Sequence, residues 1–363
     1  MQSPTRFVTH PAALSDLCAA LAEQPALALD TEFMRERTYR AELCLVQIGW
    51  PSGAVCVDPI ALESVAPLAA PLGAATSVKV LHAARQDLEV LLPAVGAIGS
   101  VFDTQVAAAL TGLPAQIGYG ELTRRLLEVE LAKAHTRADW SKRPLSDEQI
   151  EYALDDVRYL LPLRERLLET LDRLNRLAWL DEELAPLSRP MQASVDPDRA
   201  WQRLKGLQGL DDARLALARS LAAWRERRAI DRNRPRGWIL DDLVLREIIY
   251  RVPRDRAALA AIPEMQEGVV RHSGDELLSM IHAANVPDPP PPLPRREKPD
   301  PEFNALVKKL STLTQSVATE LELAPEVLAT RRDFEQLARG EKPESLTRGW
   351  RAEVIGARLL AAL

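Results

Sequence analysis

The 363-residue sequence contains few cysteines, no long apolar run and no export signal. The three cysteines, Cys18, Cys44 and Cys56, are too few for a disulfide framework and lack the spacing of metal ligands. The apolar stretches stop short of the ~18 residues that a membrane span requires. The first residues lack the basic segment and apolar core of a secretion signal. These absences predict a protein of the reducing cytoplasm that binds no membrane.

A phosphate-binding loop is also missing. No G-x-x-x-x-G-K-[ST] segment is present, which argues against a helicase and against a nucleotide cofactor. What is present is an ordinary globular composition, with 47% hydrophobic and 27% charged residues, which excludes a fibrous or wholly disordered chain. The length predicts two or three domains.

The charge is distributed unevenly along the chain. Residues 1–190 carry a net charge of −8, residues 191–363 carry +2, and the segment 199–256 carries +7. An acidic half suits divalent metals, and a basic segment suits phosphates. The alternative is that these charges only cover the solvent-exposed faces of helices.

The first ~170 residues are typical of an α/β fold. Short apolar segments predict strands at residues 27–30, 43–49, 54–58, 77–82 and 100–103. Only Trp50-Pro51-Ser52-Gly53 separates the second strand from the third, which predicts a hairpin and a partly antiparallel sheet. We expect the first strand to run into an acidic loop at Asp30. We also expect helices over 83–92, ending at Pro93, and over 104–110.

A well-marked helix is predicted to follow Pro144. Ser146 is a good N-cap, and Gln149 three residues later completes a capping box. An apolar stripe at helical spacing comprises Ile150, Leu154, Val157, Leu160 and Leu161.

From residue 194 onward the pattern is helical, without a convincing strand. Residues 287–294 hold six prolines in eight positions, which predicts a stiff linker. The chain is therefore expected to divide into residues 1–190, 194–285, a proline-rich linker over 286–295, and 296–363. The two helical parts could be divergent copies of one module.

Carboxylates recur at points where they could share a site. Asp30 and Glu32 lie at i and i+2, so on an extended chain both point to one side. Asp87 lies about one turn into a helix that follows the fourth strand. Tyr152 and Asp156 lie at i and i+4 on one helix face. Converging carboxylates repel one another unless a cation lies between them, and such oxygen ligands suit Mg²⁺ or Mn²⁺. Taken singly, each could be an ordinary surface residue.

The order and spacing of these residues match a known pattern. The segments that carry the match are Asp30-Thr31-Glu32-Phe33, Leu81-His82-Ala83, Asp87-Leu88-Glu89, Phe102-Asp103-Thr104-Gln105, Asp139-Trp140, Arg143-Pro144-Leu145-Ser146 and Tyr152-Ala153 with Asp156-Val157. Over residues 5–175 the chain closely resembles the ribonuclease D family, which belongs to the tyrosine-containing subclass of DEDD exonucleases. The C-terminal region resembles the two HRDC modules of that family, more weakly beyond Pro294.

This resemblance implies both a fold and an activity. The fold would be a ribonuclease-H-like mixed sheet flanked by helices, followed by two small all-α HRDC-like domains. Asp30, Glu32, Asp87 and Asp156 would bind two divalent cations, Mg²⁺ or Mn²⁺, and Tyr152 would orient the attacking water. The reaction would be 3′→5′ hydrolysis of RNA that releases nucleoside 5′-monophosphates. The substrates would be tRNA precursors or other structured RNAs with 3′ single-stranded tails.

Several basic and aromatic residues are candidate RNA contacts, since cations and stacking rings bind single strands without sequence preference. They are Phe33, His82, Arg35, Arg37, Lys133, Arg137, Trp140, Arg232 and Arg234. The alternatives are core packing for Phe33, a helix-start role for His82, and solvated or salt-bridged surfaces for the others. Two other functions stay open from the residues: an exonuclease that also degrades DNA, and a catalytically inactive RNA-binding scaffold.

Overall fold

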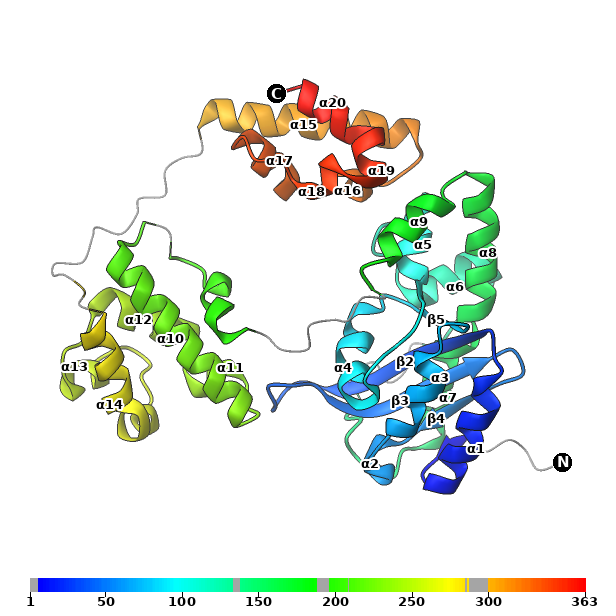
Figure 1. The fold of residues 1–363 in the computed structure, drawn as a ribbon, viewed down its shortest axis with the longest axis horizontal. Helices are drawn as coiled ribbons and strands as arrows, with labels where there is room; N and C mark the ends of the chain where they lie inside the picture. The colour runs from blue at the N-terminus through cyan, green and yellow to red at the C-terminus, as the bar shows by residue number, and fades with distance from the viewer. Residues whose placement is uncertain (1–5, 133–137, 188–195, 208, 285, 287–299) are drawn as a thin grey trace. The chain divides into compact units, whose positions relative to one another are not determined.

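The computed structural model describes residues 6–132, 138–187, 196–207, 209–284, 286 and 300–363 (Figure 1). Its one described sheet has six strands in the order β1-β4-β3-β2-β5-β6. Their bounds are β1 (Phe7–Val8), β2 (Ala26–Met34), β3 (Glu42–Trp50), β4 (Gly53–Val57), β5 (Val78–Leu81) and β6 (Val101–Asp103).

The sheet is mixed, which confirms the predicted fold class. Strands β3 and β4 pair antiparallel across the predicted hairpin, with Trp50 opposite Gly53. The pairs β1–β4, β2–β5 and β5–β6 are parallel. Neighbouring strands β2 and β3 are joined by residues 35–41 only. A parallel crossover needs a dozen or more residues, so these two strands run antiparallel.

Two expectations about the ends of elements were wrong. Strand β2 does not give way to a loop at Asp30 but continues to Met34, past its register with β5, which ends at Ala28, because β3 is nine residues long and lies on its other side. The helix after β5 does not end at Pro93. Helix α4 (Arg85–Val95) contains this proline in its last turn, ends two residues later at Val95, and is capped by Gly96 with φ +81°. The short β1 was not predicted.

Helices cover both faces of the sheet. The face with Leu29 and Ile48 packs against α1 (Pro11–Ala22), the 3₁₀ turn η1 (Ala66–Leu68), α3 (Ala69–Gly73) and α4. The face with Ala28 and Val80 packs against α5 (Thr104–Leu110), α6 (Tyr119–Leu127), α7 (Asp147–Arg158), α8 (Leu160–Arg173) and α9 (Leu177–Leu184). The short α2 (Pro59–Leu62) follows β4. The capping box at Ser146 and Gln149 that begins α7 is confirmed.

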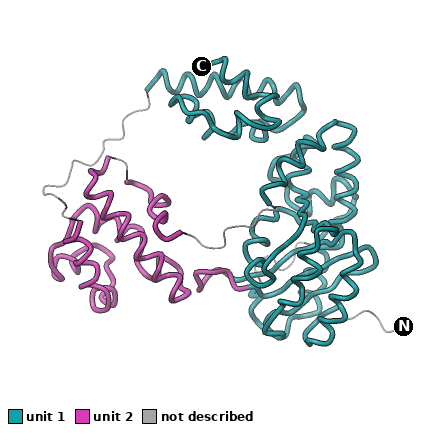
Figure 2. Tube along the Cα trace, viewed as in Figure 1, with its two compact units in different colours: residues 1–34, 43–191, 299–363 teal, residues 35–42, 192–298 magenta. Residues whose placement is uncertain are grey.

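The chain divides into two compact units, one comprising residues 1–34, 43–191 and 299–363, the other residues 35–42 and 192–298 (Figure 2). The second unit is helical, with η2 (Pro197–Arg203), α10 (Asp212–Asp231), α11 (Arg236–Ile239), α12 (Asp242–Arg251), α13 (Arg256–Ala260) and α14 (Glu267–Ala283). It also holds the loop between β2 and β3, where the Tyr39 hydroxyl donates to buried Glu226.

The last 64 residues form α15 (Pro301–Glu320), α16 (Pro325–Leu328), α17 (Arg331–Ala338), α18 (Glu344–Thr347), α19 (Gly349–Arg351), the π-helical turn η3 (Ala352–Gly356) and α20 (Ala357–Ala361). They share one hydrophobic core with α5, α8 and α9. The Trp350 ring stacks on the ring of Trp179, with the ring centroids 4.4 Å apart. The Nε1 of Trp350 donates a hydrogen bond of 2.8 Å to Glu183.

The predicted domain boundaries stay predictions, because contacts group the chain differently from its order. Residues 300–363 pack with the sheet-containing part of the chain. Residues 35–42 pack instead with the helical part formed by residues 192–298. Of the predicted linker, residues 287–295 lie outside the described residues. No described helix is both long and apolar enough to cross a membrane.

Replacing Trp350 should loosen this shared core. The side chain is 2% exposed, so Trp350→Ala leaves a large cavity and should lower the free energy of unfolding by about 3–5 kcal/mol. Chemical denaturation followed by circular dichroism would measure this. Arg348→Ala is the control, because its ion pair with Glu344 is exposed and should contribute little. Equal stability of the two variants would contradict the shared core.

Candidate active site

Three carboxylates from two elements meet above the centre of the sheet. Asp30 and Glu32 lie two residues apart on β2 and point to the face that α7 covers. Asp156 projects from α7, which packs on β2. One ligand atom from each of the three lies within 4.8 Å of the others, close enough to hold one metal ion together. The sequence prediction therefore holds for the meeting of these three side chains.

Asp87 reaches the same region from the other face of β2. It lies in the first turn of α4, is buried, and accepts a hydrogen bond of 2.6 Å from the Thr31 hydroxyl. Asp87 is outside the group of three but close enough for its charge to raise the pKa of Asp30 and Glu32. Thr31, between the two acidic residues, thus positions the fourth carboxylate, a role that sequence reasoning missed.

The four carboxyl groups hold protons more tightly than they would in water. Burial, then repulsion by Asp156 and Asp87, raises the pKa of Glu32 to about 8. Burial and the charge of Asp155 raise the pKa of Asp156 to about 7, and burial raises that of Asp87 to about 6. The pKa of Asp30 is raised well above its usual range by burial and by the other three carboxylates. A bound cation would reverse this penalty by pairing with the ionised forms.

Tyr152 lies beside this cluster, one turn before Asp156 on α7. The two side chains are hydrogen-bonded. The Tyr152 ring stacks on buried Trp140, with centroids 6.2 Å apart and planes at 29°. Burial and the charge of Asp156 raise the pKa of the phenol, so it stays protonated at neutral pH and acts as a hydrogen-bond donor.

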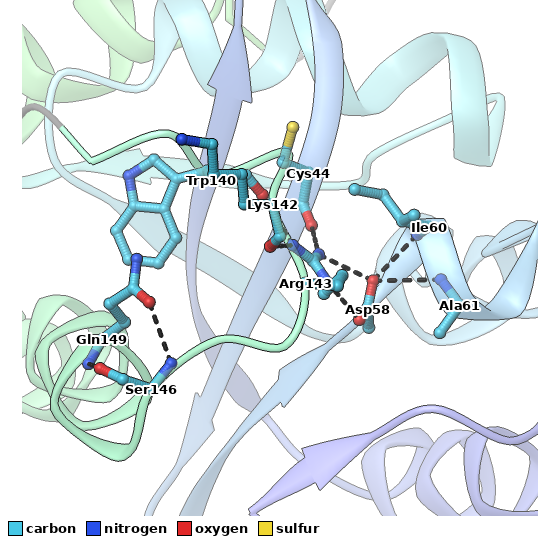
Figure 3. A network of polar contacts seen from close by, with 9 residues as sticks. All are labelled: Cys44, Asp58, Ile60, Ala61, Trp140, Lys142, Arg143, Ser146 and Gln149. Carbon is cyan, nitrogen blue, oxygen red and sulfur yellow. Dashed lines mark hydrogen bonds and ion pairs between the residues drawn. The ribbon is translucent and has the colours of Figure 1, made fainter.

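The segment before α7 is tied to the sheet through one arginine (Figure 3). Arg143 forms a bidentate pair with Asp58, with Nε 2.6 Å from Oδ2 and Nη2 2.8 Å from Oδ1. Its Nη2 also donates to the carbonyl oxygen of Cys44 on β3 at 2.7 Å, and its Nη1 to that of Trp140. Because Asp58 also caps α2, α7 starts from a fixed point.

Asp103 performs a similar task for the helix that carries Asp87. Its carboxylate accepts hydrogen bonds from the backbone nitrogens of Ala83 at 3.0 Å, Ala84 at 2.8 Å and Gln105 at 2.8 Å. Ala83 has φ +56°, a strained conformation for a residue with a side chain, and these bonds offset that strain. The signal in the sequence was an aspartate just before a predicted helix.

The candidate RNA contacts fall into three groups. His82 and Trp140 have structural partners: the His82 nitrogens contact Thr104 at 2.9 Å and the Ile117 carbonyl at 3.0 Å, and Trp140 is 3% exposed. Both side chains are thus held by contacts within the protein, and their contact with RNA stays a prediction. Phe33 is half-buried.

The remaining candidates are arginines and a lysine. Arg35 and Arg37 are exposed on the loop after β2, and Arg232 and Arg234 are exposed after α10. Arg234 lies over the ring of Trp238, which is 54% exposed. Lys133 and Arg137 lie outside the described residues.

Both the sheet-containing part and the helical part of this chain are similar to known protein families. Residues 5–172 match the 3'-5' exonuclease family, and residues 214–281 match the HRDC domain family. A protein named ribonuclease D from Granulibacter bethesdensis is 39% identical, over 99% of this chain and 92% of its own. The protein named ribonuclease D from Pseudomonas paraeruginosa is 38% identical, over 99% of this chain and 97% of its own. The crystal structure of Escherichia coli RNase D, an exoribonuclease involved in structured RNA processing, is similar to this fold, with 30% sequence identity, a TM-score of 0.88 and 99% of each chain covered.

Removing one of the crowded charges should stabilise the metal-free protein. Between pH 4.5 and about 8 the folded state binds the Glu32 proton more tightly than the unfolded state does, so stability falls as pH rises through this window. With chelator present, Glu32→Gln should therefore melt at a higher temperature than the wild type at pH 8, and this advantage should vanish near pH 5. A melting temperature below that of the wild type at pH 8 would contradict the mutual repulsion.

Proposed function

The chain belongs to the ribonuclease D family, and on that premise we propose that it shortens structured RNAs, tRNA precursors among them, with divalent metal ions held by Asp30, Glu32, Asp87 and Asp156. Membership of the family makes it a 3'→5' exoribonuclease, and the exonuclease fold implies the use of divalent metal. The observation that carries the proposal is the meeting of three carboxylates within 4.8 Å on β2 and α7. The cytoplasmic location stays a prediction from the sequence.

The side chains at the site suit hard divalent cations. Every candidate ligand is a carboxylate, and oxygen-only ligand sets favour Mg²⁺ or Mn²⁺ over softer metals. Two such ions, when bound, would activate the attacking water and neutralise the charge that develops on the leaving 3′-oxygen. Asp87, held by Thr31, stands where it can complete the set from the opposite face of β2.

Tyr152 would orient the water without removing its proton. Its phenol is held by Asp156 and supported by Trp140, so the Oη–H occupies a fixed position next to the carboxylates. Because the phenol stays protonated at neutral pH, it can hold the water in line but is a poor base.

The helical unit would bind the body of the RNA. Its HRDC domain carries exposed Arg232 and Arg234 with the half-exposed Trp238, a combination of cations and an aromatic ring that suits phosphates and unpaired bases. Structured RNA processing is the activity named for the Escherichia coli relative, and we extend it to this chain. Residues 1–190 would then hydrolyse the 3′ end, while 194–285 and 296–363 position the substrate.

Replacing Asp30 tests the site. Asp30→Asn should reduce hydrolysis by at least ~100-fold, more than the loss of an outer-shell partner, while RNA binding persists. The assay uses a 5′-labelled RNA hairpin with a 3′ single-stranded tail, in Mg²⁺, Mn²⁺ or chelator. Asp155→Asn is the control, because Asp155 pairs with Arg158 and is not among the three clustered carboxylates. Wild-type turnover by Asp30→Asn would refute the assignment.

An all-deoxy copy of the same strand separates the remaining alternatives. A metal-dependent ladder on RNA only would establish an RNA-specific exonuclease. Equal ladders on both strands would favour a general exonuclease. RNA binding without any ladder would favour an inactive scaffold.

The arginines of the helical unit should act on affinity and not on chemistry. Arg232→Ala together with Arg234→Ala should weaken binding to the structured RNA. The slope of the logarithm of the binding constant against the logarithm of the salt concentration should become shallower by about one for each lost phosphate contact. Hydrolysis of a short single strand should change little. The control, Arg251→Ala with Arg256→Ala, changes the charge equally but removes arginines that pair with Glu247 and Asp275. Equal weakening by both double variants would show only a general charge effect.

A further inference from the structure

One polar side chain beside the carboxylates has no role in the site as described so far. Gln47 on β3 is fully buried, and neither its Oε1 nor its Nε2 has a hydrogen-bond partner among the described residues. No other described residue has its whole side-chain amide buried and unsatisfied in this way. Unpaired buried polar atoms cost stability, so such a residue in a strand calls for an explanation.

The strand register places Gln47 opposite Asp30. A Cβ on Gly49 would lie 3.2 Å from the Cβ of Ala28, so these two residues oppose each other on one face of the antiparallel pair β2–β3. Side chains that point to the same face of a strand are two residues apart. In an antiparallel pair, the residue number rises along one strand while the number of the opposing residue falls along the other. Two residues further along, Gln47 therefore opposes Asp30. Directly opposed side chains have Cβ atoms ~4.5–5.5 Å apart.

The next strand gives independent support for this placement. Cys56 on β4 pairs directly with Gln47 on β3. The charges of Glu32 and Asp30 both contribute to raising the pKa of the Cys56 thiol, after burial and Glu151. The Gln47 position is thus flanked by residues that face the acidic cluster.

We propose that Gln47 is a positioning residue for the metal-binding carboxylates, and that its side-chain amide donates a hydrogen bond to Asp30 once a cation holds that carboxylate in its ionised form. The inference rests on the proposed metal-dependent function. An amide suits this place because it brings a donor without a charge: a lysine would displace the cation, and an acid would add to the repulsion. Outer-shell partners of this kind orient metal ligands.

The test replaces the amide with an apolar side chain of similar length. Gln47→Met in the full-length protein should weaken Mn²⁺ binding by about 10–100-fold, as measured by titration calorimetry. The melting temperature in chelator should be equal to or higher than that of the wild type, because two unsatisfied polar atoms are removed. Turnover of a short single strand should fall at low Mn²⁺ and recover at high Mn²⁺, with KM for the RNA unchanged.

A second variant and a reference separate the outcomes. Gln47→Glu should melt at a lower temperature than Gln47→Met in chelator, because the added carboxylate increases the repulsion around Asp30 in the metal-free protein. Unchanged Mn²⁺ affinity in Gln47→Met would overturn the proposal, and so would a lower melting temperature in chelator that accompanies the weaker binding, since that indicates a packing role. Asp30→Asn serves as the reference: if it binds Mn²⁺ as the wild type does, the proposed function fails, whatever the result at Gln47.

Discussion

The repulsion between carboxylates held within 4.8 Å is the constraint on which the rest of the exonuclease part depends. Asp30, Glu32 and Asp156 each hold a proton more tightly than in water, because burial and the neighbouring charges oppose ionisation. Such a cluster costs stability in the metal-free protein, and it persists because rigid elements leave its members no room to separate. The same crowding gives a divalent cation its advantage at this place.

The surrounding contacts serve to maintain that geometry. Strand β2 is central in the sheet and covered on both faces, so its two acidic residues cannot move apart. Asp103 holds the start of α4, Arg143 holds the segment before α7, and Trp140 supports the ring of Tyr152. Each is a buried or half-buried polar or aromatic group with several partners, which is how a fold converts packing into precise orientation.

The C-terminal helices belong to the same compact unit as the carboxylate cluster. Their shared core with α8 and α9, closed by the stacked pair Trp179 and Trp350, makes residues 300–363 part of the unit that holds the site. The loop after β2, in contrast, follows the sheet strand directly in the chain but belongs to the helical unit, where the Tyr39 hydroxyl donates to Glu226. Chain order and physical grouping therefore differ in this protein.

Local patterns sufficed for much of the site. The spacing of Asp30 and Glu32, the helical offset of Tyr152 and Asp156, and the capping box at Ser146 are short-range features that depend on the periods of strand and helix. Tertiary structure alone decided that β2 continues beyond Asp30, that Thr31 bonds Asp87, and that Trp140 is buried under Tyr152. It also placed Gln47 opposite Asp30. These contacts join residues far apart in the chain, and no local pattern specifies which of the available partners a strand or a buried ring will meet.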